Sequence, residues 1–352
     1  MNLSDLSYVL HPLQAAIRDG FVRVNEGVPS KPGLALRPGD VVACRLPPLP
    51  SLEASPEDIP LDVVYEDDHL LVINKAAGMV IHPAPGNYTG TLVSALLHRF
   101  GLPSVRLSAD DSPGDELEAA ESEDGDEERA VPWALPETPM SVGQSGDVIR
   151  PGIVHRLDKG TTGLMVAAKD ERTLTGLAAQ FKAHTVQRVY HAIVLGVPKE
   201  AEGVIETNIG RDIRDRKKMG VFSYMGRHAV SGYRVIEPLA GDSAAYTAWR
   251  LQTGRTHQIR VTNDHRWTSV ESHPLLGDDT YGGAGGTAVA AIGRGKGARQ
   301  VVAHRVLKLL ARPALHAKTL GFVHPVTKEA LSFTSELPTD FATVLEELRN
   351  LD

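Results

Sequence analysis

The stretch of residues 153–184 constrains the fold of this 352-residue chain more tightly than any other part. Its first half, IVHRLDKGTTGLMVAAK, has two apolar runs around a glycine-containing turn, which predicts two strands. Its second half, DERTLTGLAAQFKAH, places Leu174, Leu177 and Phe181 at helical spacing after Asp170, a residue type that caps helices. Further strand patterns follow in RVYHAIVLG and AYTAWRLQ. Hairpins with a few helices predict an α+β fold with a mixed, largely antiparallel sheet, rather than a doubly wound sheet.

The composition changes along the chain and indicates separate parts. Residues 1–47 combine a helical pattern that ends at Gly20 with two short strand patterns, which predicts a small N-terminal unit. Residues 48–60 are rich in proline and indicate a stiff linker. Residues 61–352 carry the larger, strand-rich pattern. Inside it, the apolar periodicity disappears at about 103–147, and this composition predicts a disordered insertion because it cannot offset the entropy lost on ordering.

The net charge of −7 argues against a nucleic-acid partner until its distribution is considered. Residues 108–128 hold 11 of the 44 acidic residues and no Lys or Arg. The rest of the chain therefore has 37 basic against 33 acidic residues, a net charge of +4. An acidic tract inserted in a mildly basic body permits RNA binding without proving it.

Several classes of protein and site are made improbable by what the chain contains. The chain has a single cysteine, Cys44, which excludes an internal disulfide and leaves Cys-based zinc sites without enough ligands. No apolar run approaches the roughly 20 residues of a membrane span, and the first residues do not resemble a secretory signal. The histidines form no HExxH or comparable metal motif. We therefore expect an intracellular, soluble protein without a metal or another cofactor.

Asp158 cannot be assigned a role from its local sequence. It lies between a basic residue and Lys159-Gly160 at the end of a predicted strand. An ordinary turn aspartate fits that position well, because Asp side chains commonly bond to the backbone of turns. A catalytic carboxylate fits it too.

Longer segments narrow these alternatives. GIVHRLDKGTTGLMVAAKD resembles the catalytic motif of the RluA-type RNA pseudouridine synthases, with members such as RluC and RluD. YEDDHLLVINKAAGMVIHPAPG, RVYHAIVLG, LQTGRTHQIRV, HPLLGDDTYGG and ALHAKTLGFVHP are similar to further segments of that family, in the family's order. Together they span most of residues 61–334. The resemblance implies the catalytic fold of that family and the isomerisation of uridine to pseudouridine, a reaction without metal or redox cofactor.

The resemblance also implies roles for particular residues. Asp158 is the expected catalytic carboxylate, Tyr190 is expected to pack against the target base, and Arg255 is expected to pair with Asp158. Because a stacked uridine cannot reach a buried carboxylate, base flipping is required, and Arg156 is expected to assist it. A basic strip is expected to bind the RNA backbone: Arg211, Arg214, Arg216, Lys217 and Lys218.

In the N-terminal unit, LQAAIRDGFVRVNEGVPSKPGLALRPGD resembles part of an S4-type RNA-binding module whose first helix is missing or very short. With the basic strip, this favours structured RNA as the partner, ribosomal RNA over transfer RNA, bound by a monomer. The expected compartment is the cytoplasm, or a chloroplast or mitochondrion in a eukaryote. Residues 262–272 depart from the family pattern, so RNA selection is expected to differ there.

Two other functions remain open from the residues. A catalytically altered RNA-binding or ribosome-assembly protein could keep the same fold, and the short S4-like unit and the altered 262–272 segment favour it. A glycosidic-bond hydrolase could also use Asp158, but such enzymes ordinarily use a pair of carboxylates, and no second one is apparent.

Overall fold

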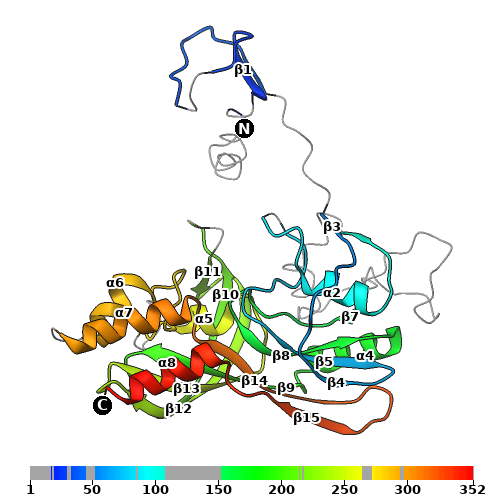
Figure 1. Ribbon diagram of the computed structural model, residues 1–352, viewed down its shortest axis with the longest axis vertical. Helices are drawn as coiled ribbons and strands as arrows, with labels where there is room; N and C mark the ends of the chain where they lie inside the picture. The colour runs from blue at the N-terminus through cyan, green and yellow to red at the C-terminus, as the bar shows by residue number, and fades with distance from the viewer. Residues whose placement is uncertain are drawn as a thin grey trace. The chain divides into compact units, whose positions relative to one another are not determined.

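The chain forms two compact units, Met1–Ser51 and Leu52–Asp352. The computed structural model describes residues 17, 20–29, 33–44, 52–84, 86–107, 152–213, 215, 218–263, 272–293 and 297–351. Figure 1 shows the helices and strands of both units. In the described residues, no helix combines the length and the apolar character needed to cross a membrane.

The described part of the N-terminal unit is a two-stranded sheet. β1 (Val22–Val24) pairs antiparallel with β2 (Val42–Cys44). The chain leaves β1 through a turn in which Asn25 has a left-handed backbone, φ 50°, and its side chain donates to Asp40 at 2.7 Å. Asparagine tolerates this conformation better than most residues. Both predicted strands are therefore confirmed, whereas the predicted helix before Gly20 falls almost entirely outside the described residues.

An eleven-stranded sheet forms the body of the larger unit. Its strands run in the order β11-β10-β12-β13-β9-β14-β8-β5-β4, with β15 paired to β14 and β7 paired to β8. All neighbours are antiparallel except β8 and β14, which are parallel. This confirms the predicted mixed, largely antiparallel sheet. The strands are β4 (Val63–Glu66), β5 (Leu70–Lys75), β7 (Gly152–Ile153), β8 (Thr162–Ala168), β9 (Gln187–Leu195), β10 (Glu202–Arg211), β11 (Met219–Phe222), β12 (Arg227–Leu239), β13 (Ala244–Leu251), β14 (Leu315–Val323) and β15 (Ala330–Thr334).

The parallel junction of β8 and β14 depends on a glycine. Gly163 pairs with Ala317 and has φ 116°, a conformation that side chains rarely adopt. A Cβ atom at this position would lie 2.3 Å from the Ala317 carbonyl oxygen. The two strands can therefore approach only with glycine there, and this contact fixes the start of β8 just after Asp158.

Helices cover both faces of the sheet (Figure 1). Strand β8 is buried along its whole length, with Met165 facing one core and Val166 facing another. The first core is completed by α2, the second by α4, and a third core lies under α6, α7 and α8. The predicted α4 is confirmed, since the Asp170 side chain accepts from the Thr173 N–H at 2.8 Å. The helices are α2 (Leu92–Arg99), α4 (Glu171–Lys182), α5 (Gln258–Asn263), α6 (Gly285–Ile292), α7 (Ala298–Leu310) and α8 (Thr339–Arg349).

A short two-stranded sheet lies where sequence patterns indicated irregular structure. β3 (Leu52–Ala54) falls inside the predicted linker, and β6 (Val105–Leu107) falls at the start of the predicted insertion. Ala54 is fully buried against Val93, Leu97 and Val105, so apolar burial orders this segment despite the nearby prolines. The remainder of the predicted insertion, to about residue 147, lies within 108–151, which are outside the described residues.

Candidate active site

Asp158 lies on the connection between β7 and β8. The Thr161 N–H donates to its backbone carbonyl at 3.0 Å, which closes a turn before β8. Just upstream, His155 is buried, accepts from the Val166 N–H at 3.1 Å and stacks on Phe181. Burial lowers the pKa of His155 to about 3, so this histidine is neutral and structural. The connection is thus anchored on both sides of the carboxylate.

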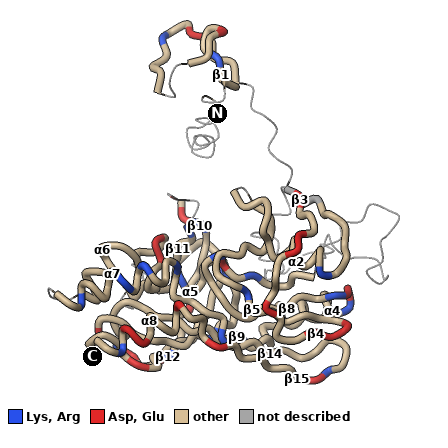
Figure 2. The backbone as a smooth tube through the Cα atoms, viewed as in Figure 1, with Lys and Arg blue, Asp and Glu red and all other residues tan. Residues whose placement is uncertain are grey.

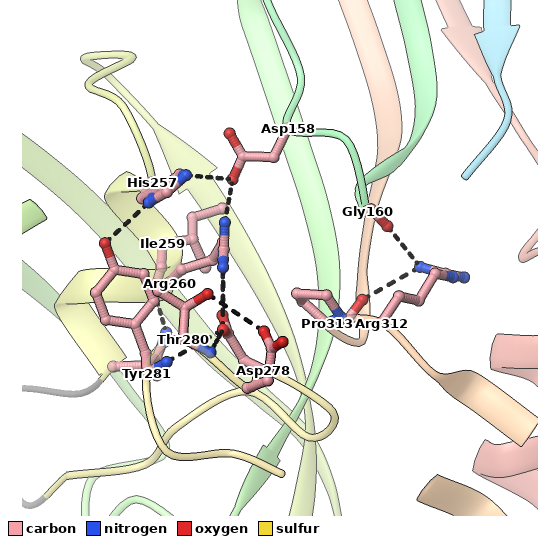
Figure 3. A network of polar contacts seen from close by, with 12 residues as sticks. Asp158, Gly160, His257, Ile259, Arg260, Asp278, Thr280, Tyr281, Arg312 and Pro313 are labelled. Atoms are coloured by element: carbon pink, nitrogen blue, oxygen red, sulfur yellow. Dashed lines mark hydrogen bonds and ion pairs between the residues drawn. The ribbon is translucent and has the colours of Figure 1, made fainter. Parts of the chain in front are cut away.

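The side chain of Asp158 is paired with Arg260, in the first turn of α5 (Figure 3). The Nη1 atom of Arg260 donates to Oδ2 of Asp158 at 3.0 Å. The same guanidinium donates through Nε and Nη2 to the two oxygens of Asp278, at 2.7 and 3.0 Å. Arg260 is 7% exposed and Asp278 is fully buried. One buried arginine therefore bridges two carboxylates, of which only Asp158 is partly exposed, at 18% of its side chain.

Tyr281 and His257 complete the support around this pair (Figure 3). The Tyr281 hydroxyl interacts with Nδ1 of His257 at 2.9 Å, and Nε2 of His257 lies 3.8 Å from Oδ2 of Asp158. The Arg260 guanidinium lies over the Tyr281 ring, 5.2 Å from its centroid. His257 has φ 57°, an uncommon conformation outside glycine that turns the chain into α5. Such strain is tolerated where surrounding contacts fix the backbone.

The structure pairs Asp158 with Arg260, whereas the resemblance implied Arg255. Nε of Arg255 donates instead to the carbonyl oxygen of His228 on β12, at 2.8 Å. Arg255 precedes α5, and its backbone N–H donates to the Gln258 side chain. The Arg255 side chain extends toward β12. Arg260 lies inside the helix, on the face toward Asp158. The two arginines belong to one motif, TGRTHQIR, and only the position of the helix start separates their roles.

The environment of Asp158 favours its charged form. Burial raises the pKa of this carboxyl, but the nearby His257, Arg260 and Arg156 outweigh it and hold the pKa below its ordinary value. Burial also lowers the pKa of His257 itself. Arg260 is consequently the neighbour that stays cationic at neutral pH and contacts Asp158 directly. The carboxylate is ionised although it is largely enclosed.

Tyr190 lies on β9, 6% exposed, in the same core as Leu157. Burial raises the pKa of its phenol, and the negative charge of Asp158 is close enough to raise it further. Within the described residues, no hydrogen bond to its hydroxyl is formed. Tyr190 is therefore a neutral aromatic group near the carboxylate.

Two buried cations hold the turn that carries Asp158, and the sequence patterns did not single out either one. Nζ of Lys75 donates to the carbonyls of Ala76 and Met79 at 2.9 Å and approaches that of Lys159 at 3.5 Å. Burial lowers the pKa of Lys75 to about 8.

On the other side of the turn, Nη1 of Arg312 donates to the Gly160 carbonyl at 3.2 Å. Its Nε and Nη2 donate to Asp340 on α8, at 2.6 and 2.8 Å. Arg312 therefore links the C-terminal helix to the turn of Asp158, across 152 positions of sequence.

Asp158 opens into a cavity of about 1470 Å³. Of the predicted RNA-binding residues, Arg156 and Arg211 are exposed and line this cavity. Lys218 is half-buried on the β10–β11 connection and does not line it. The other three members of the predicted strip, Arg214, Arg216 and Lys217, lie outside the described residues, as does most of the altered segment, at 264–271.

Comparison with known proteins assigns the chain to a family. Residues 69–265 match the family profile described as RNA pseudouridylate synthase. The chloroplastic RNA pseudouridine synthase 2 of rice (Oryza sativa subsp. japonica) is 44% identical over 344 residues, 96% of this chain and 76% of that protein. Ribosomal large subunit pseudouridine synthase D of Zymomonas mobilis is 37% identical over 340 residues, 96% of this chain and 88% of that protein.

A solved structure, human RNA pseudouridylate synthase domain containing 4, has the same kind of fold. It superposes with a TM-score of 0.51 at 22% identity, over 82% of this chain and 93% of that chain. The family profile covers more than half of the chain and includes both Asp158 and Arg260. The class is therefore RNA pseudouridine synthase, an intramolecular isomerase. Within that class, the chain belongs to the RluA family.

Replacing Arg312 by glutamine is expected to slow pseudouridine formation about 10- to 100-fold at saturating enzyme, with little change in RNA affinity. The turn loses its contact at Gly160, and displacing a reacting group by even 1 Å can cost about a hundredfold in rate. Single-turnover rates at several enzyme concentrations separate the rate from the affinity. Arg349→Gln is the control, because Arg349 also connects α8 to the sheet, through Glu237, but at an exposed site. An unchanged rate in Arg312→Gln would contradict the role of Arg312 in positioning the turn that carries Asp158.

Proposed function

We propose that this enzyme isomerises uridines of large-subunit ribosomal RNA to pseudouridine, with Asp158 as the catalytic carboxylate. The observation that carries the role of Asp158 is its ion pair with buried Arg260 at the edge of a large cavity. The ribosomal target is supported by relatives named ribosomal large subunit pseudouridine synthase D, from Zymomonas mobilis and from Pseudomonas aeruginosa, 37% and 38% identical.

The reaction conserves every atom of the uridine. The bond between N1 and C1′ breaks, the uracil turns, and a bond forms between C5 and C1′; C5 loses a proton and N1 gains one. An aspartate can attack the sugar, add to the base, or take a sugar proton that starts elimination. All three routes require the ionised form, which Arg260 stabilises.

Tyr190 is proposed to pack against the target base. A phenol offers an apolar face for stacking and a hydroxyl for proton transfer. Its pKa is raised by burial, which keeps the hydroxyl protonated. This favours the stacking role over that of the base that removes the C5 proton.

Base flipping is proposed to bring the uridine to Asp158, because the carboxylate is mostly enclosed. Arg156 lies two residues before Asp158, exposed at the cavity. It is suited to fill the space that the uridine vacates or to hold the adjoining phosphate, and Arg211 is suited to bind the backbone further along.

The N-terminal unit is proposed to be an S4-type module that adds RNA contacts. The support is the β1–β2 hairpin and the similarity of LQAAIRDGFVRVNEGVPSKPGLALRPGD to such modules. Its strands carry few cations, with Arg23 on β1, so its contribution to affinity is expected to be small beside that of the catalytic unit.

Mapping pseudouridines in total RNA tests the proposed target. In cells that lack the gene, we expect one or a few pseudouridines of the large-subunit ribosomal RNA to disappear and to return when the wild-type gene is restored. Loss of a transfer RNA site with an intact ribosomal map would contradict the ribosomal assignment. An unchanged map in every RNA would instead support an RNA-binding protein that has kept this fold without turnover.

A further inference from the structure

We propose that helix α7 forms a second RNA-binding wall of the active-site cavity, where Lys308 and His304 contact phosphates of the strand next to the flipped uridine. The inference rests on the proposed function. It adds a binding surface outside the motifs that suggested the reaction, on a helix that carries none of the predicted site residues.

The cavity has room for more than one nucleotide. Pockets that enclose one small ligand have volumes of about 300–1,000 Å³. The cavity beside Asp158 has a volume of about 1470 Å³. Its lining extends from the Asp158 turn to α6 and α7, where Val289, Leu307 and Ala311 contribute apolar surface. The part beyond Asp158 is therefore available to the nucleotides that flank the target.

α7 presents one face to the core and another to this cavity. Ala303, Val306 and Leu310 are buried in the core under α6 and α8. His304 and Lys308, four residues apart and so on one side of the helix, are exposed and line the cavity. A histidine and a lysine with this spacing can contact the same stretch of sugar–phosphate backbone.

Lys and Arg positions lie along α7 (Figure 2). Among the described residues, the other cations on or next to α7 are engaged in the fold: Arg299 donates to the carbonyl of Ala240, Arg305 is paired with Glu347, and Arg312 is paired with Asp340. Lys308 forms no ion pair or side-chain hydrogen bond within the described part of the chain. An unpaired cation that faces the cavity, on a helix whose other cations are occupied, has the chemistry of a phosphate contact.

The charge of the whole cavity lining agrees with this assignment. Of its three carboxylates, Asp340 is paired with Arg312, and Asp158 shares Arg260 with Asp278, which is not part of the lining. Asp279 remains, against four further cations: Arg156, Lys159, Arg211 and Lys308. The lining is therefore net positive, and Lys308 adds its charge from α7, whereas Arg156 and Lys159 add theirs from the Asp158 turn.

Salt-dependent binding tests the proposal without requiring turnover. The probe is an oligouridylate of about 12 nucleotides, within the range of single-strand binding sites. Fluorescence anisotropy gives its Kd between about 50 and 200 mM salt for the wild type, Lys308→Gln, Lys308→Arg and Lys182→Gln. Lys182 is an exposed lysine at the end of α4 that does not line the cavity, so its substitution changes the net charge equally.

We expect Lys308→Gln to reduce the slope of log Kd against log salt by about 0.7, the value for one phosphate contact on a single strand. Lys308→Arg and Lys182→Gln should keep the wild-type slope. A wild-type slope in Lys308→Gln, or an equal decrease in Lys182→Gln, would overturn the proposal. This assay measures RNA binding and not pseudouridine formation. A failure of the α7 proposal is therefore distinguishable from a failure of the proposed function, which the mapping of pseudouridines tests.

Photo-crosslinking provides a second measurement that does not depend on charge. Cys44 is the chain's single cysteine, so a Cys44→Ser background allows one benzophenone label at Lys308→Cys or at Lys182→Cys. We expect ultraviolet light to crosslink the oligouridylate from position 308 and not from position 182. Equal yields at both positions would contradict a specific RNA contact on α7.

Discussion

Arg260→Gln is expected to slow pseudouridine formation at neutral pH by a hundredfold or more, about the effect of losing one preorganised electrostatic contact in an active site. The substitution removes the donor that contacts Asp158 and leaves the fully buried Asp278 without its guanidinium. Breaking a buried ion pair in this way costs about 3–5 kcal/mol in the free energy of unfolding. Thermal unfolding should therefore shift to lower temperature as the rate falls.

The pH dependence of kcat/KM distinguishes a change at Asp158 from general damage to the fold. In the wild type the pKa of Asp158 lies below its ordinary value, so the carboxylate stays ionised well into the acidic range. Without Arg260, burial is opposed only by His257 and Arg156, so the pKa of Asp158 is expected to rise. The acid side of the profile should move to higher pH, and part of the lost activity should return as the pH is raised.

Arg255→Gln is the matched control in the same motif. It also removes a buried guanidinium, one that donates to the His228 carbonyl, so a loss of about 1–3 kcal/mol in stability is expected. Its pH profile should keep the wild-type acid limb. A shift of the acid limb of the pH profile in Arg255→Gln, together with an unshifted acid limb in Arg260→Gln, would contradict the assignment of Arg260 as the partner of Asp158.

Features that depend on neighbours in sequence were predictable. The cap of α4 by Asp170 needs only residues within one helical turn, and the apolar run of β8 reflects burial on both faces of that strand. The mixed antiparallel sheet follows from a succession of such local patterns. The catalytic role expected for Asp158 rested on a long motif, because a turn aspartate and a catalytic aspartate have the same neighbours in sequence.

Features that depend on tertiary contacts were not predictable from the patterns. Which arginine of TGRTHQIR reaches Asp158 depends on where α5 begins, and a shift of a few residues in that start exchanges their directions. Lys75 and Arg312 act on the turn from 84 and 152 positions away, through carbonyl oxygens that carry no sequence signal. The segment Leu52–Ala54 was predicted to be linker because prolines flank it, whereas the burial of Ala54 stabilises it as a strand.

Asp158→Asn is expected to have the largest effect on activity, a decrease of at least about 10⁴-fold, comparable to the loss of a catalytic nucleophile in other enzymes. Asparagine has nearly the same shape and keeps an oxygen that can accept from Nη1 of Arg260. The fold should therefore persist, with near-normal thermal unfolding. Only the negative charge and its reactivity are removed.

The most direct test uses the proton that leaves C5. Ribosomal RNA from cells that lack the gene, labelled with tritium at uridine C5, is incubated with purified enzyme, and released tritium is counted. We expect the wild type to release tritium in proportion to the pseudouridine formed, and Asp158→Asn to release none above background while it unfolds at the wild-type temperature. Release by Asp158→Asn within about tenfold of the wild-type rate would contradict the central role of this carboxylate.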